Sequence, residues 1–226
     1  MRRLVLIALM ALPLFGGFFP STTHTKITAI EGEILSLKSA LPVTGMSGIV
    51  VHNYGNGTQS ATSFIEQTAK GHAKVIDKDI IHHDALPTIK TAIAKGDKVI
   101  GGYLYNTVLL LAPDAQTYAR ITSAYHKKWI HPDHFALFLN KLGERQPTKA
   151  NLLAFAKSYQ IGLIAIVKQG SLTLLDPISQ KTIATKPLKN LPSEGKSPFF
   201  MRFDSLRSGW FSTSKTLPYY QMMEAI

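Results

Sequence analysis

The stretch that decides the fold is IGLIAIV, residues 161–167, a continuous apolar run. A short apolar run bounded by turn residues is typical of a strand that is buried on both faces of a sheet. Two more strand-like segments follow at 171–175 and 181–184, after turns at Gln169-Gly170 and Asp176-Pro177. The sequence therefore predicts a buried central strand that leads into a β-meander.

Helical patterns precede this strand. Asp114 and Thr148 are predicted to cap helices that run to residues 124 and 159, because short polar side chains at this position accept hydrogen bonds from the first turn. The sequence His131-Pro132-Asp133 predicts the start of another helix, since proline suits the first helical position. We expect residues 108–189 to form a small α/β layer, with helices packed on a mostly antiparallel sheet.

Residues 24–107 are predicted to be β-rich. Short segments rich in β-branched residues, such as 27–30 and 48–51, alternate with turn sequences such as Asn56-Gly57 and Lys70-Gly71. Many short strands joined in this way are typical of a small β-barrel or a sandwich. The whole chain is therefore expected to have an α+β fold.

The C-terminal segment, residues 190–226, is rich in proline and in aromatic residues, including Trp210 and Phe211. Aromatic side chains at this density are expected to pack back onto the fold. An exposed interaction patch is the alternative.

The N-terminus has the pattern of an export signal. Met1, Arg2 and Arg3 precede an apolar run, residues 4–19, that is short for a membrane span. We predict a signal peptide over residues 1–23, with an uncleaved N-terminal membrane anchor as the alternative. The protein is then expected in the periplasm or on the outer cell surface.

The composition limits the possible partners. The formal net charge is +11, and removal of Arg2 and Arg3 with the signal leaves +9. Such a surface favours anionic partners, for example envelope lipids or acidic glycans. We expect no nucleic-acid partner, because the basic residues are scattered and the protein is predicted to be exported. The chain has no cysteine, which excludes disulfides and thiolate chemistry.

One group of side chains could hold a metal ion. His131 and His134 lie about one helical turn apart, and Asp133 lies between them. The alternative is structural, since Pro132 and Asp133 already suit the start of a helix. His82-His83-Asp84 is a weaker candidate, because adjacent side chains in a strand point to opposite faces.

The sequence contains no motif on which to base an enzymatic activity. A Gly-x-Ser-x-Gly elbow, a His-Glu-x-x-His pair and a phosphate-binding glycine loop with its lysine are all missing. We therefore expect neither an enzyme nor a bound cofactor.

The ordered pattern from Lys26 to Phe211 resembles the N-terminal domain family of bacterial plasminogen-binding surface proteins. The resemblance rests on six features in this order: Lys95-Gly96-Asp97, Leu109-Leu110-Leu111-Ala112-Pro113, Phe138-Leu139-Asn140, Asn151-Leu152, Gly162 with Ile166-Val167, and Ser197-Pro198-Phe199-Phe200. It implies an exported, envelope-associated protein whose domain has no catalytic role.

The resemblance also implies a way in which the chain could bind plasminogen, whose kringle domains capture lysine side chains. Plasminogen-binding members of the family carry a lysine-rich region after this domain, whereas this sequence closes with Glu224-Ala225-Ile226. We expect any plasminogen binding by this chain to use internal lysines. The candidates are Lys181, Lys186, Lys189 and Lys196.

The leading functional hypothesis is a non-enzymatic envelope protein that binds or scaffolds a protein partner. Its expected contact features are the basic surface and the aromatic tail with Trp210 and Phe211. Plasminogen-dependent adhesion through exposed lysines is one alternative. A histidine-based metal-binding protein or metalloenzyme that uses His131, His134 and Asp133 is the other.

Overall fold

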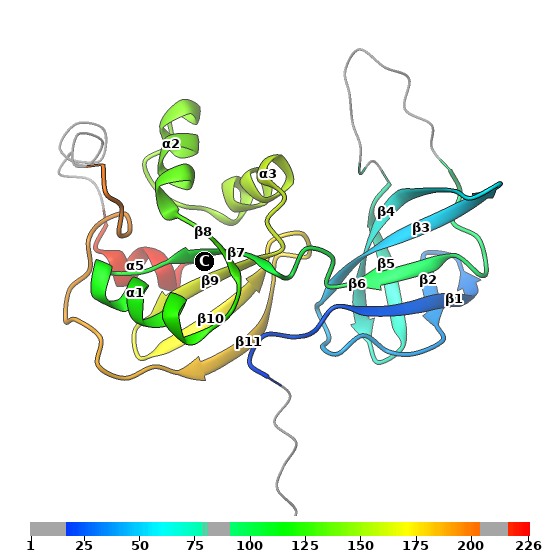
Figure 1. Cartoon of the computed structure of the whole chain (residues 1–226), viewed down its shortest axis with the longest axis horizontal. Helices are drawn as coiled ribbons and strands as arrows, with labels where there is room; N and C mark the ends of the chain where they lie inside the picture. The colour runs from blue at the N-terminus through cyan, green and yellow to red at the C-terminus, as the bar shows by residue number, and fades with distance from the viewer. Residues whose placement is uncertain (1–16, 79, 81–90, 204–216) are drawn as a thin grey trace, which may run out of the picture.

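The computed structural model describes residues 17–78, 80, 91–203 and 217–226. These residues form two parts that follow each other along the chain, a β-barrel and a sheet covered by helices (Figure 1). The α+β fold predicted from the sequence is confirmed. Within the described ranges, no helix has the length and apolar character needed to cross a membrane.

The first part is a closed antiparallel barrel with the strand order β1-β2-β5-β4-β3-β6. Its strands are β1 (Thr23–Glu31), β2 (Ile34–Leu37), β3 (Ser47–Gly55), β4 (Thr58–Ala69), β5 (His72–Asp77) and β6 (Lys98–Gly101). Buried residues such as Ile27, Leu35 and Ile65 alternate with exposed ones, as expected when every second side chain points into a barrel. Closure leaves no free strand edge in this part.

The second part is a five-stranded sheet with the order β11-β10-β9-β7-β8. Its strands are β7 (Thr107–Leu111), β8 (Lys128–Ile130), β9 (Leu163–Lys168), β10 (Ser171–Asp176) and β11 (Lys181–Pro187). The predicted meander is present as the antiparallel run β9-β10-β11. The sheet is nevertheless mixed, because β7 pairs in parallel with both β8 and β9.

The parallel pairing follows from the helices between these strands. Helix α1 (Ala115–Ala124) connects β7 to β8, and helices α2 (Pro132–Leu142) and α3 (Lys149–Tyr159) lie between β8 and β9. A crossover helix returns the chain to the same end of the sheet, so that the next strand runs in parallel. The predicted caps are present: Asp114 accepts a hydrogen bond from the Thr117 N–H, and Thr148 accepts one from the Asn151 N–H.

Each face of this sheet packs against a different core. Side chains such as Val108 and Leu163 face the core that also contains the barrel residues Ile27 and Leu35. Their neighbours Leu109 and Ile164 face a second core, which α2, α3 and the short helix α5 (Tyr219–Glu224) cover. Strand β9 is therefore buried on both faces, as its continuous apolar sequence predicted.

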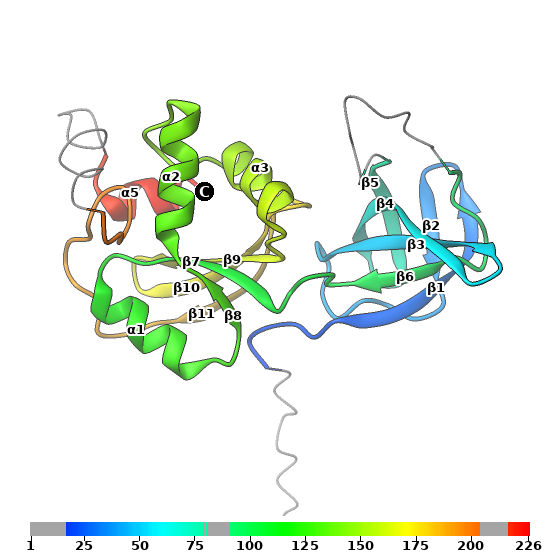
Figure 2. The ribbon, with the colours of Figure 1, turned by 45° about the horizontal axis from the view of Figure 1, so that its top comes forward.

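The described part of the C-terminal segment packs on the second core. Phe199, Met223 and Ile226 are buried there, and so is Tyr219, whose hydroxyl donates to the Val167 carbonyl at 2.7 Å. Figures 1 and 2 show α5 beside the sheet, on the side away from the barrel. Trp210 and Phe211 lie outside the described residues.

A fully buried carboxylate joins the two parts. Asp176, at the end of β10, accepts hydrogen bonds at Oδ2 from the Ser47 N–H (2.7 Å) and from the Tyr105 hydroxyl (2.6 Å). Its Oδ1 accepts from the N–H groups of Ile178 (2.9 Å) and Ser179 (3.1 Å). Ser47 belongs to the barrel and Tyr105 to the linker between β6 and β7, so this one side chain connects barrel, linker and sheet.

The Tyr105 hydroxyl remains a donor in this arrangement. Burial raises its pKa well above the usual value, and the neighbouring Asp176 carboxylate raises it further. A second contact lies beside the first, because the Ser179 hydroxyl donates to the Gly45 carbonyl of the barrel at 2.6 Å.

We predict that Asp176→Ala lowers the free energy of unfolding by about 3–5 kcal/mol, because buried donors lose a charged acceptor. Urea denaturation measures this change. Tyr105→Phe is the matched control, with an expected loss of about 1–2 kcal/mol, since the carboxylate keeps three of its donors. A loss below about 1 kcal/mol for Asp176→Ala would contradict the structural role of this carboxylate.

Candidate functional site

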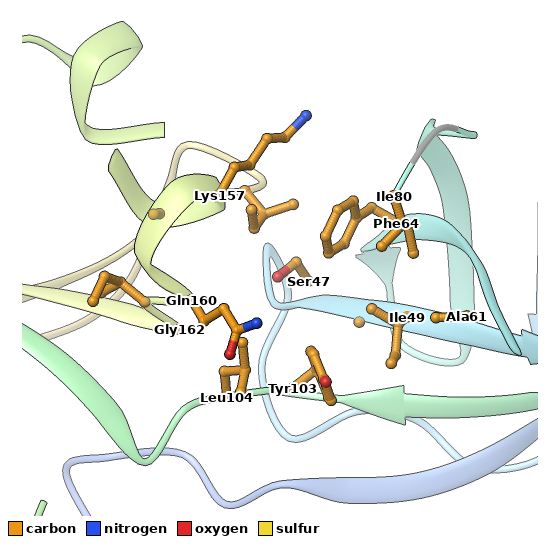
Figure 3. Close-up of a pocket in the computed structure, with 14 residues that line it drawn as sticks. Ser47, Ile49, Ala61, Phe64, Ile80, Tyr103, Leu104, Lys157, Gln160 and Gly162 are labelled. Carbon is orange, nitrogen blue, oxygen red and sulfur yellow. The ribbon is translucent and has the colours of Figure 1, made fainter. Parts of the chain in front are cut away.

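A cleft of about 260 Å³ lies where the barrel meets the α/β part (Figure 3). Ile49, Ala61 and Phe64 line it from the barrel, and Lys157 and Gln160 line it from the end of α3. Figure 3 shows these two groups on opposite sides of the opening, with Tyr103 of the linker below them. Among the lining residues that the structure describes, most are apolar and one, Lys157, is cationic.

The cleft depends on the same contacts that join the two parts. Ser47 and Ile178 are lining residues, and the N–H group of each donates to Asp176. Near the opening, Lys157 forms an ion pair with Asp77 of the barrel at 2.7 Å between Nζ and Oδ2. Lys157 Nζ also lies 5.9 Å from the centre of the Phe64 ring. This cation therefore lies between the two walls of the cleft.

The backbone around the cleft is locally strained. Leu104 and Gln160 both line the cleft, and both adopt positive φ angles of 67° and 55°. This conformation costs roughly 1 kcal/mol for a residue with a side chain, and such residues cluster at functional sites. Gly162 shows how closely the linker approaches, because a Cβ there would lie 2.1 Å from the Leu104 carbonyl oxygen. Apolar walls and strained residues at the rim are both typical of a binding site.

The described lining of the cleft has few polar side chains. Its polar side chains are those of Ser47, Tyr103, Lys157 and Gln160, and among the lining residues that the structure describes there is no imidazole or carboxylate. The site can accept an apolar side chain and place an anionic group near Lys157.

The predicted metal cluster lies elsewhere, at the start of α2. Asp133 is buried, and its carboxylate accepts hydrogen bonds from the Arg202 main-chain N–H (2.8 Å) and from Arg202 Nε (2.6 Å). His131 Nδ1 lies 3.2 Å from the Asp133 nitrogen and 3.1 Å from Oδ2, whereas His134 is exposed. Asp133 thus connects the start of α2 to the C-terminal segment.

This environment changes two pKa values. Burial lowers the pKa of His131, and the charges of Arg202 and His134 lower it further against the opposing effect of Asp133. Burial alone would raise the pKa of Asp133, but the hydrogen bonds from Arg202 outweigh it and hold this pKa below its usual value. No group of three or more metal-ligating side chains gathers in the described ranges, and the metal hypothesis stays a prediction.

The predicted lysine contacts divide into two kinds. Lys181, Lys189 and Lys196 are exposed, and none of them forms an ion pair with a carboxylate among the described residues. Lys186 is half-buried, because its amino group lies 4.8 Å from the Phe18 ring centre and 4.5 Å from that of Tyr125. Burial lowers the pKa of Lys186.

The exposed lysines follow the outer rim of the sheet. Lys181 begins the edge strand β11 beside Gly45 of the barrel, and the main-chain N–H of Lys196 donates to the Pro113 carbonyl at 2.8 Å. Lys189 lies between them, just after β11. In Figure 1 the chain runs from β11 around the outside of the α/β part.

Sequence reasoning did not identify the cleft, because its lining comes from segments that are far apart in the chain. The turn at Asp176-Pro177 and the glycine at 162 were both visible, but their partners were not.

Comparison with known proteins agrees with the resemblance found in the sequence. A family model described as "Plasminogen-binding protein pgbA N-terminal" matches residues 22–226. Two curated relatives, the plasminogen-binding proteins PgbA of Helicobacter pylori strains J99 and 26695, are each 28% identical over 147 residues. This stretch covers 62% of the present chain and 32%, about a third, of each relative. No solved structure matches the chain.

We predict two separate losses of stability on acidification. A His whose pKa is lowered by folding destabilises the fold as the pH falls below about 6.5. A lowered Asp pKa gives stability that is present above about pH 3.9 and is lost as the pH falls through the folded-state value. His131→Asn should abolish the first loss and keep a capping residue, and Asp133→Asn should abolish the second.

Unfolding free energies between about pH 7 and pH 2 test this prediction. Acid profiles of both variants that match the profile of the unchanged protein would show that the two groups do not titrate as the structure indicates.

Proposed function

The chain belongs to the family of the plasminogen-binding protein PgbA N-terminal region, and from this premise we propose that it is a non-enzymatic binding protein of the cell envelope. Its partner in this proposal is a protein, and host plasminogen is the first candidate. The N-terminal sequence Met1-Arg2-Arg3 and the apolar run that follows support export.

The proposal rests on three exposed lysines at the rim of the sheet, Lys181, Lys189 and Lys196, which form no ion pair within the described residues. A lysine that pairs with a carboxylate of its own chain is less available to a partner. Lys181, Lys189 and Lys196 are exposed and have no such pairing within the described residues, whereas Lys157 pairs with Asp77. These three amino groups therefore suit capture by kringle domains, and that of Lys196 also lies 5.9 Å from the centre of the Phe200 ring.

Charge alone would produce a different kind of binding. A protein with a net charge of +11 attracts anionic lipids and glycans without specific contacts, and salt weakens such binding strongly. Lysine-specific recognition differs, because a free lysine analogue competes for it. The experiment must separate these two effects.

We predict that the full chain binds immobilised plasminogen at physiological salt and that a free lysine analogue removes this binding. The triple variant Lys181→Ala, Lys189→Ala, Lys196→Ala should bind at least about tenfold more weakly. Lys38→Ala, Lys70→Ala, Lys95→Ala is the matched control on the barrel, and it removes the same charge from exposed positions.

A third variant with arginine at 181, 189 and 196 keeps the charge and should also lose affinity. Equal weakening by the two alanine triples, with full recovery in the arginine variant, would indicate unspecific attraction instead. A complete lack of binding would reject plasminogen as the partner of this chain.

A protein of the bacterial envelope is the second candidate partner, and the cleft favours it. The cleft offers apolar walls, and Tyr103 is exposed at its edge. We predict that a photo-crosslinking amino acid at position 103 gives one defined product in intact cells. The same group at Tyr54, an exposed residue at the opposite end of β3, should not give that product. Identical products from both positions would argue against the cleft.

A further inference from the structure

The segment that precedes the barrel is packed against the fold. Phe18 and Phe19 are half-buried, and Pro20 is buried. The Thr22 hydroxyl donates to the Gly102 carbonyl at 2.9 Å, and Thr23 pairs with Gly101 in the β1–β6 ladder. Figures 1 and 2 show this segment passing alongside the α/β part before it enters β1.

The two phenylalanine rings occupy an aromatic site on the α/β part. The Phe19 ring meets Tyr125 edge-on at 5.0 Å and Trp129 at 6.1 Å between ring centres. The Phe18 ring lies 6.2 Å from Tyr125 and 5.2 Å from Phe19. Pairs of aromatic rings at these distances stabilise a fold beyond the apolar area that they bury.

Two lysines complete this site. Lys186 Nζ lies 4.8 Å from the Phe18 ring centre, and Lys127 Nζ lies 5.0 Å from that of Phe19. Both side chains are half-buried, and this burial lowers the pKa of Lys127 and of Lys186. A cation over an aromatic face gains more when it is partly desolvated. Removal of the rings would leave these two cations beside an open apolar surface.

The same segment also contacts the barrel. A hollow of about 360 Å³ is lined by Phe18, Phe19 and Pro20 together with Pro42 and Val43, which follow β2, and with Ile183 of β11. Phe18 and Phe19 pack against the core that the barrel and the sheet share. The segment is therefore a further connection between the two parts, besides Asp176, the Ser179–Gly45 contact and the Lys157–Asp77 ion pair.

We propose that Phe18-Phe19-Pro20 remains in the exported protein as a structural anchor, and that an envelope signal peptidase cuts the leader before Phe18. In this hydrolysis a peptide bond breaks, water supplies the hydroxyl of the new leader carboxyl group, and its hydrogen goes to the new amino terminus. For a cut directly before Phe18, Gly17 supplies the small residue at the last leader position, and Phe15 stands where the usual pattern has the other small residue. A cut after residue 23 would instead remove the whole anchor and the first residue of β1.

The first experiment determines the N-terminus of the protein in the envelope. The full chain is expressed in a bacterium with a working export pathway, and peptide mass spectrometry identifies the first residue of the envelope form. We expect Phe18 or an earlier residue. A first residue at Phe19 or later overturns the proposal. This experiment rests on the proposed export, and recovery only from the cytoplasm would contradict export and with it the proposed cut.

The second experiment tests the packing independently of export. In the full chain, Phe18→Ala with Phe19→Ala should lower the Tm by about 5 °C or more, because two half-buried rings are lost. Ile34→Ala is the control, since Ile34 is 52% exposed on the barrel and its removal should leave the Tm within about 2 °C. An unchanged Tm in the double variant would overturn the anchor.

Discussion

The buried carboxylate of Asp176 is the interaction on which the rest of the structure depends. A carboxylate removed from water is costly unless donors surround it, and here four groups donate to it, two of them from the barrel and the linker. This requirement fixes where the barrel lies on the sheet. The linker must then pass close to β9, which is possible because Gly162 has no side chain in the way. The cleft and its strained rim at Leu104 follow from the same arrangement.

The basic side chains divide into two groups, those that form contacts within the fold and those that are exposed. Lys157 spans the cleft, Lys127 and Lys186 lie under the rings of Phe19 and Phe18, and Arg202 holds Asp133. These four cations form ion pairs or ring contacts within the fold. Lys181, Lys189 and Lys196 form no ion pair with a carboxylate within the described residues, while Lys196 Nζ lies 5.9 Å from the centre of the Phe200 ring. The difference in ion pairing is why the proposed recognition of plasminogen is assigned to these three lysines. Net charge alone would not have separated the two groups.

Local sequence patterns predicted the local structure. The caps at Asp114 and Thr148 and the apolar run of β9 depend on neighbouring residues, and the structure confirms them. Patterns of this kind could not give the parallel pairing of β7, nor the burial of Asp176, whose barrel partner Ser47 is 129 residues away. The sequence Asp176-Pro177 predicts a turn, and a turn is usually exposed. The sequence likewise did not indicate the burial of Lys186, because the two rings beside it come from the distant residues Phe18 and Tyr125.

Hydrogen exchange of the full chain, alone and in complex with plasminogen, tests the central functional claim most directly. The account predicts that slower exchange on binding is confined to β11 and to the segment up to Lys196, where the exposed lysines lie. It also predicts that the barrel strands β2 to β5 exchange at the same rate in both states. Protection confined to the barrel, or no protection in a complex formed at physiological salt, would contradict recognition through these lysines.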